Sequence, residues 1–147
     1  MKRLGLLFVC FATLAFTSCS LFQAASGSNT VAQASGKACG TAVQGLYSSY
    51  KNTGKVDLTV GNNLSYALAL ATAYTEMQQN KDNQAYRNAF INGLISSSAG
   101  LITTANAGKF VDKMLASAGL GNVTADKVTQ TAATVAAIVA LLNVLKQ

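Results

Sequence analysis

Apolar residues at helical spacing are the feature that most constrains how this chain of 147 residues can fold. Between residues 39 and 50 they recur at i, i+3, i+4 and i+7, as on one face of an α-helix. The members of this set are Cys39, Ala42, Val43, Leu46, Tyr47 and Tyr50. Ser35 is a candidate N-cap, and Gly54 stands where a left-handed residue would end the helix. The pattern predicts a helix that buries one face.

The segment from 62 to 79 is apolar almost all the way round. Its polar positions fall on one narrow strip, formed by Ser65, Thr72, Glu76 and Gln79. A helix with so thin a polar face should be central, with neighbours on most sides. The preceding residues, 55–61, alternate weakly and fit either an extended link or a first helical turn capped by Asp57.

The next predicted helix starts with Asp82 as N-cap and runs to about Thr104. Small residues form a ridge along it at spacings of three and four, namely Gly93, Ser97, Gly100 and Thr104. Glycine inside a helix costs about 0.5–1 kcal/mol relative to alanine, so the ridge favours close approach of a neighbouring backbone. The alternative is a break in the helix at residues 97–100.

Two further helices complete the pattern. One runs from about Ala107 to Ala118 and ends at Gly119; the other is capped by Thr124, with Asp126 in its first turn and Lys146 in its last. The apolar run 135–142 in this last helix is well short of the ~20 residues that span a bilayer, which favours a buried core helix over a membrane segment. About five helices and no convincing strand predict an all-α bundle over residues 38–147.

The N-terminus has the layout of a secretory signal, with a positive start followed by an apolar run of about 13 residues. Lys2 and Arg3 supply the charge, and residues 4–16 supply the apolar run. The four residues that follow, Phe16-Thr17-Ser18-Cys19, resemble the lipobox of bacterial lipoproteins, with Phe16 where leucine is usual. Two alternatives are a plain signal peptide cut elsewhere and a retained membrane anchor.

The resemblance implies that residues 1–18 are removed as a lipoprotein signal peptide and that Cys19 carries the lipid, typically diacylglycerol with palmitate. Two acyl chains hold a protein stably on a bilayer. Ser20 after the acylated cysteine implies the outer membrane, on its periplasmic face. Residues 19–37 are small, polar and nearly uncharged, which predicts a flexible tether.

The composition leaves little material for catalysis. The chain has no histidine, and only 11% of its residues are charged. Its acidic residues are Asp57, Glu76, Asp82, Asp112 and Asp126, at spacings that suggest no catalytic pair. Without histidine or a cysteine cluster, no closed zinc site can be composed. We therefore expect no enzyme, no metal and no cofactor.

Two single residues have a functional and a structural interpretation. Cys39 as a nucleophile would need a base, and its place in the apolar stripe predicts a buried thiol instead. Glu76 is the only glutamate in the chain. It could hold a cation or an amine, but a solvent-facing carboxylate paired with Arg87 or Lys81 is the simpler interpretation.

The lysines are scattered along the sequence, which argues against a nucleic-acid site. The favoured function is therefore a lipid-anchored, non-catalytic structural or interaction module that contacts another envelope protein. The alternative is a carrier for a small apolar or aromatic ligand, with Tyr66, Tyr74 and Glu76 as polar fixtures of its cavity. An enzyme of unfamiliar type is the third possibility. The sequence leaves the specific partner and the oligomeric state open.

Overall fold

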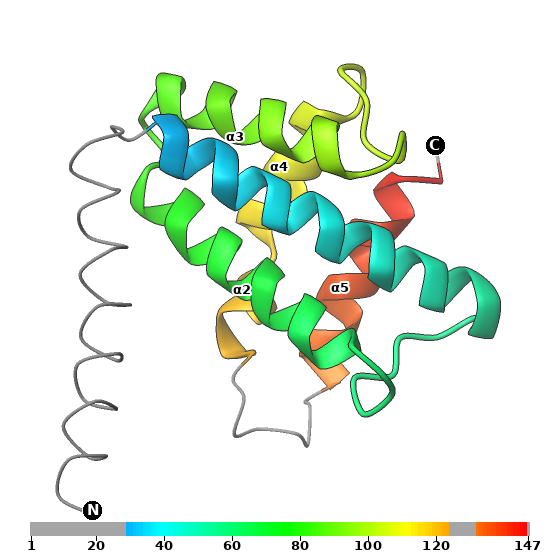
Figure 1. Cartoon of the computed structure of the whole chain (residues 1–147). Helices are drawn as coiled ribbons and strands as arrows, with labels where there is room; N and C mark the ends of the chain where they lie inside the picture. The colour runs from blue at the N-terminus through cyan, green and yellow to red at the C-terminus, as the bar shows by residue number, and fades with distance from the viewer. Residues whose placement is uncertain (1–28, 124–131, 147) are drawn as a thin grey trace, which may run out of the picture.

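The computed structural model describes residues 29–123 and 132–146, and every regular element in those ranges is a helix (Figure 1). Residues 29–53 form the first of them, called the long helix below. The others are α2 (Asn63–Gln79), α3 (Gln84–Ser97), α4 (Ala107–Ala116), the 3-10 helix η1 (Ala118–Asn122) and α5 (Ala132–Val144). They share one core of buried apolar side chains, which confirms the all-α bundle expected from the sequence.

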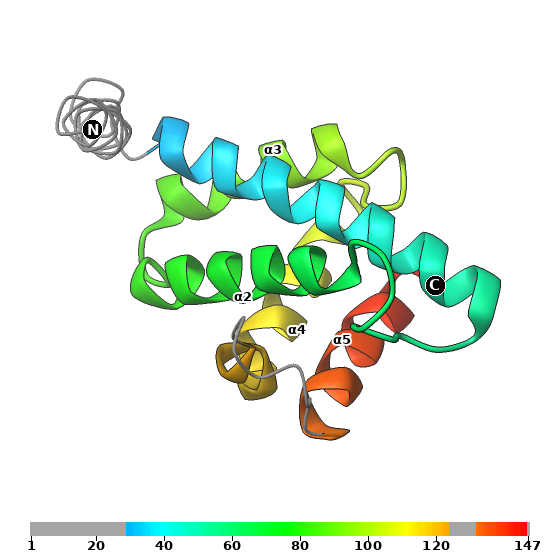
Figure 2. The ribbon, with the colours of Figure 1, turned by 60° about the horizontal axis from the view of Figure 1, so that its bottom comes forward.

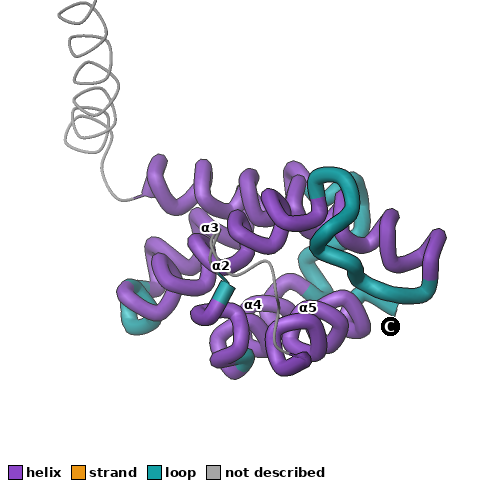
Figure 3. The backbone as a smooth tube through the Cα atoms, turned by 90° about the horizontal axis from the view of Figure 1, so that it is seen from below, coloured by secondary structure: helices purple, strands orange, loops and turns teal. Residues whose placement is uncertain are grey.

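The long helix crosses one side of the bundle, and α4 and α5 lie on the opposite side (Figure 3). Helix α2 lies between these two layers, and α3 runs beside the long helix, as the tilted view shows (Figure 2). The chain enters the described part at one end of the long helix. The other end of the long helix and the last turn of α5 lie together at the far end of the molecule (Figure 1).

The long helix begins earlier than expected. Residues 29–37 are helical, so the prediction of a flexible tether is wrong for them, and Ser35 is not an N-cap but lies inside the helix. Ala32 is completely buried, and a Cβ atom at Gly36 would overlap the carbonyl oxygen of Phe90. Small side chains let this segment pack directly against α3, and that packing, rather than a large apolar face, holds it helical. Residues 19–28 lie outside the described part.

The rest of the long helix confirms the apolar stripe. Cys39, Val43 and Leu46 are fully buried. Gly54 ends the helix with a φ of +74°, as its position predicted, and its N–H donates to the carbonyl of Tyr50 at 2.8 Å. Residues 54–62 then form an irregular loop, which is neither the extended link nor the helical turn that the sequence left open.

Helix α2 confirms the prediction of a central helix. Leu70 and Met77 are fully buried on it, whereas Ser65, Thr72 and Gln79 of the predicted polar strip are exposed. It contacts α4 and η1 on one side and the long helix on the other.

Helix α3 differs from its prediction at both ends. The N-cap is Asn83 rather than Asp82, and its side-chain oxygen accepts from the N–H of Tyr86 at 3.1 Å. The helix ends at Ser97, so the predicted extension to Thr104 is wrong and the break at 97–100 is confirmed. Ala99 and Gly100 reverse the chain there with φ values of +52° and +84°.

The predicted small-residue ridge is confirmed for its first two members only. A Cβ atom at Gly93 would overlap the carbonyl oxygen of Gln33 and come within 2.9 Å of the backbone nitrogen of Lys37. The Ser97 hydroxyl donates to the Lys37 carbonyl at 2.8 Å. Gly100 and Thr104 lie beyond the helix end and take no part in this contact.

The last elements close the core. Phe110, Val111 and Met114 of α4 are buried as predicted, but α4 ends at Ala116, and the exposed Ala118 begins η1. In α5, Ile138, Leu141 and Leu142 are fully buried, which confirms a core helix. No helix in the described ranges is both long enough and apolar enough to cross a membrane. Thr124 and Asp126, the predicted cap and first-turn residues, lie outside those ranges.

Candidate functional site

The one site residue that the sequence singles out, Cys19, lies outside the described residues, as does the whole lipobox-like motif at 16–19. The attachment of lipid at Cys19 therefore stays a prediction. The side chains that could carry chemistry in the described domain can be placed one by one.

Cys39 is a buried thiol. Its exposed fraction is zero, and the helical stripe turns it into the core. Burial raises the pKa of the thiol to about 12 because the anionic form would lose its hydration. A thiol that stays protonated and out of contact with solvent is a poor nucleophile. The structural interpretation of Cys39 is confirmed.

The Glu76 carboxylate accepts a hydrogen bond from a buried tyrosine. The Tyr86 hydroxyl donates to Oε2 of Glu76 at 3.2 Å, and Tyr86 is only 3% exposed. Burial, and after it the neighbouring carboxylate, raise the pKa of Tyr86 to about 12. An ion pair of Glu76 with Arg87 or Lys81 is not found among the described residues, where Arg87 pairs instead with Asp112 at 2.6 Å. The hydrogen bond between Tyr86 and Glu76 joins the start of α3 to the end of α2.

Two other described carboxylates, those of Asp57 and Asp112, each have a partner of their own. Asp57 accepts from the hydroxyl and the N–H of Thr59 at 2.6 and 2.9 Å, and these two bonds, the hydroxyl's first, lower its pKa. Asp112, on α4, pairs with Arg87 of α3. Within residues 29–123 and 132–146, no three acidic or sulfur side chains come close enough to hold a metal ion.

The two tyrosines assigned to a ligand cavity are packed against glycine backbones. The ring of Tyr66 lies against Gly45 of the long helix, where a Cβ atom would overlap it. Tyr74 lies against Gly121, 3.3 Å from where a Cβ would stand. Both rings thus fill space between helices.

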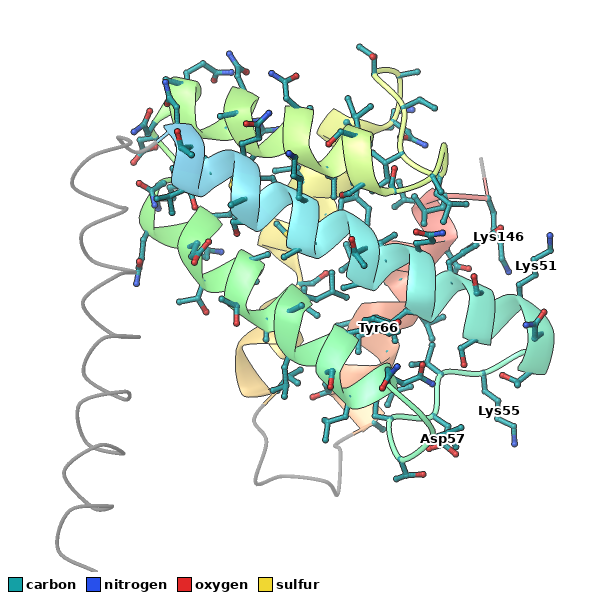
Figure 4. The ribbon with its side chains drawn as sticks, viewed as in Figure 1. Lys51, Lys55, Asp57, Tyr66 and Lys146 are labelled. Atoms are coloured by element: carbon teal, nitrogen blue, oxygen red, sulfur yellow. The ribbon has the colours of Figure 1, made fainter. Side chains whose placement is uncertain are left out.

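The fold brings together one group of charged residues that the sequence did not predict to be neighbours. Lys51, Lys55 and Lys146 all lie at the far end of the molecule (Figure 4). The Lys146 ammonium lies 4.5 Å from the centroid of the Tyr50 ring and donates to its hydroxyl at 3.3 Å. Because 96 residues separate Tyr50 from Lys146, no local pattern could have predicted that contact.

The comparisons with known proteins give no match, whether to a family model, to a curated protein or to a solved structure.

Proposed function

We propose that this protein is a non-catalytic interaction module of the bacterial envelope, held on the outer membrane and facing the periplasm by acyl chains on Cys19. The observation that carries the proposal is the lipobox-like sequence at residues 16–19, placed directly after a charged start and an apolar run. Two acyl chains give a stable anchor, whereas one gives only marginal binding.

The described domain supports a role in binding rather than in catalysis. Cys39, the one described thiol, is buried and protonated. Glu76 is bound by Tyr86, and Asp112 is paired with Arg87. Catalytic sites instead gather titratable groups with perturbed pKa values around a common cleft.

The position of the anchor limits how far the domain can lie from the membrane. About ten residues separate Cys19 from residue 29, and a fully extended chain of that length spans at most ~35 Å. The near end of the long helix therefore stays within that distance of the acyl chains. An anchored domain of this kind presents its helical surface to other envelope components.

Metabolic labelling with an alkyne analogue of palmitate tests the anchor. We expect the wild-type protein to take up the label and Cys19→Ser to take up none. Cys39→Ser is the matched control, since it removes a cysteine that is buried, and it should label like the wild type. Equal labelling of Cys19→Ser and the wild type would overturn the proposal.

A further inference from the structure

The long helix carries positive charge without any negative charge. Lys37 and Lys51 are both exposed, and residues 29–53 contain no aspartate or glutamate. Fourteen positions separate the two lysines, which is close to four helical turns, so both lie on one side of the helix. Gln44 and Ser48, also exposed, lie between them on the same side.

The charge continues beyond the end of the helix. Lys55 and Lys146 are exposed and lie at the same end as Lys51 (Figure 4). Asp57 is the only acidic residue between residues 29 and 62. Its carboxylate accepts two hydrogen bonds from Thr59 and is also influenced by Lys55, so it offsets one of the four positive charges in this region.

Outside the long helix and its far end, the charges of the described residues nearly cancel, with a net charge of +1: Lys81, Arg87, Lys109 and Lys113 stand against Glu76, Asp82 and Asp112. Arg87 is paired with Asp112, and Lys109 and Lys113 flank that aspartate on α4. The excess of positive charge in the described domain is therefore concentrated on the long helix and the residues at its far end.

We propose that the basic stripe, defined as Lys37, Lys51 and Lys55, docks on the anionic phospholipid headgroups of the bilayer that holds the acyl chains. This inference rests on the proposed function, because the anchor supplies the membrane. Only about ten residues separate Cys19 from the long helix. The acyl chains therefore keep the stripe near the membrane surface, where the effective concentration of headgroups is high. Each lysine near an anionic surface strengthens docking about fivefold.

Docking of the stripe sets the orientation of the domain. The long helix, about 37 Å long, then lies along the membrane surface instead of standing on it. Helices α4 and α5 lie on the other side of the bundle and face away from the lipid (Figure 3). That side is left free for another envelope component.

A single-tryptophan reporter tests the orientation, because the chain has no tryptophan of its own. Gln44→Trp places the reporter within the basic stripe, and Ala116→Trp places it at the exposed end of α4. The acylated proteins are reconstituted into phosphatidylcholine vesicles with or without phosphatidylglycerol, all containing a dansyl-labelled lipid. We expect energy transfer from Gln44→Trp to rise with phosphatidylglycerol and to fall again at ~1 M salt, where screening is strong. Transfer from Ala116→Trp should stay low.

Charge variants show whether the stripe itself is responsible. In the Gln44→Trp protein, Lys37→Gln with Lys51→Gln should weaken docking on the order of 25-fold. Lys109→Gln with Lys113→Gln removes the same charge from α4 and should leave transfer unchanged. Equal transfer with and without phosphatidylglycerol, or equal effects of the two pairs, would overturn docking.

The two proposals fail in different ways. Protein that carries no acyl chain and does not float with the vesicles contradicts the anchor. Protein that floats with the vesicles but whose Gln44→Trp reporter ignores phosphatidylglycerol keeps the anchor and contradicts the docking.

Discussion

The backbone of Gly93 lies directly against the carbonyl oxygen of Gln33, so closely that a Cβ atom at position 93 would overlap that oxygen. Gly36 makes the reciprocal contact with the carbonyl of Phe90. Small residues on both helices thus allow the long helix and α3 to approach backbone to backbone. This contact holds residues 29–37 on the bundle. They are the part of the described domain that is nearest in sequence to the proposed anchor at Cys19.

Gly93→Ala should destabilise the fold by about 1–3 kcal/mol, because two helix backbones must move apart to admit the methyl group. Gly108→Ala in α4 is the matched control, since nothing lies within 4 Å of the added Cβ. It should stabilise by about 0.5–1 kcal/mol through the alanine preference of helices. Urea unfolding measures both, and equal stability of the two variants would contradict the close contact.

Ala99→Gly should stabilise the protein by up to about 1 kcal/mol. Ala99 is exposed and has a φ of +52°, a conformation that costs an L-residue roughly 1–2 kcal/mol and glycine almost nothing. The same change at the exposed Ala38, inside the long helix, should cost about 0.5–1 kcal/mol. Thermal unfolding of both variants checks the opposite signs; a loss at Ala99 would show that no strain is stored there.

Cys39 should resist alkylation by iodoacetamide in the native protein. Its side chain is fully buried and its thiol stays protonated, so the reaction requires the core to open. Peptide mapping should show modification only as urea unfolds the chain. The exposed thiol introduced by Ser48→Cys on the same helix should react at once, and equal rates at the two sites would contradict the burial of Cys39.

Tyr86 should make the protein less stable as the pH rises from about 10 to about 12. In that range an unfolded tyrosine loses its proton, whereas the folded Tyr86, with its pKa raised to about 12, keeps it. The folded state then binds more protons, and its free energy of unfolding falls with pH. Tyr86→Phe should lower stability at pH 7 by about 0.5–1.5 kcal/mol through the lost hydrogen bond to Glu76.

Above pH 10 the Tyr86→Phe variant should lose stability more slowly than the wild type. Urea unfolding at several pH values follows the difference between the two proteins. Cys39 also titrates in the alkaline range, but it is present in both and cancels in the comparison. Parallel pH profiles would contradict the raised pKa of Tyr86.

Large apolar residues at helical spacing were sufficient to predict much of this fold. The stripe through Cys39 and Leu46 and the narrow polar strip of α2 both describe how those helices are buried. The same rule missed residues 29–37, because a surface made of Ala32 and Gly36 shows no large apolar side chain. It packs through backbone contact, which a hydrophobic pattern does not record.

Positions that depend on the fold as a whole were harder to predict. The end of α3 was predicted only as an alternative, because it is set by the conformation of Ala99 and Gly100, of which only the glycine is a usual signal. The lysines are scattered in the sequence, and Lys146 meets Tyr50 only in the fold, where the last turn of α5 reaches the end of the long helix. Two residues that lie 96 positions apart form no local pattern from which such a contact can be predicted.

The most direct measurement of the central claim is mass spectrometry of the protein purified from the membrane fraction. We predict that its N-terminal peptide begins at Cys19 and carries the mass of a diacylglycerol with further acylation of the amino group. An unmodified Cys19 inside a longer peptide that still contains residues 16–18 would contradict the lipid anchor.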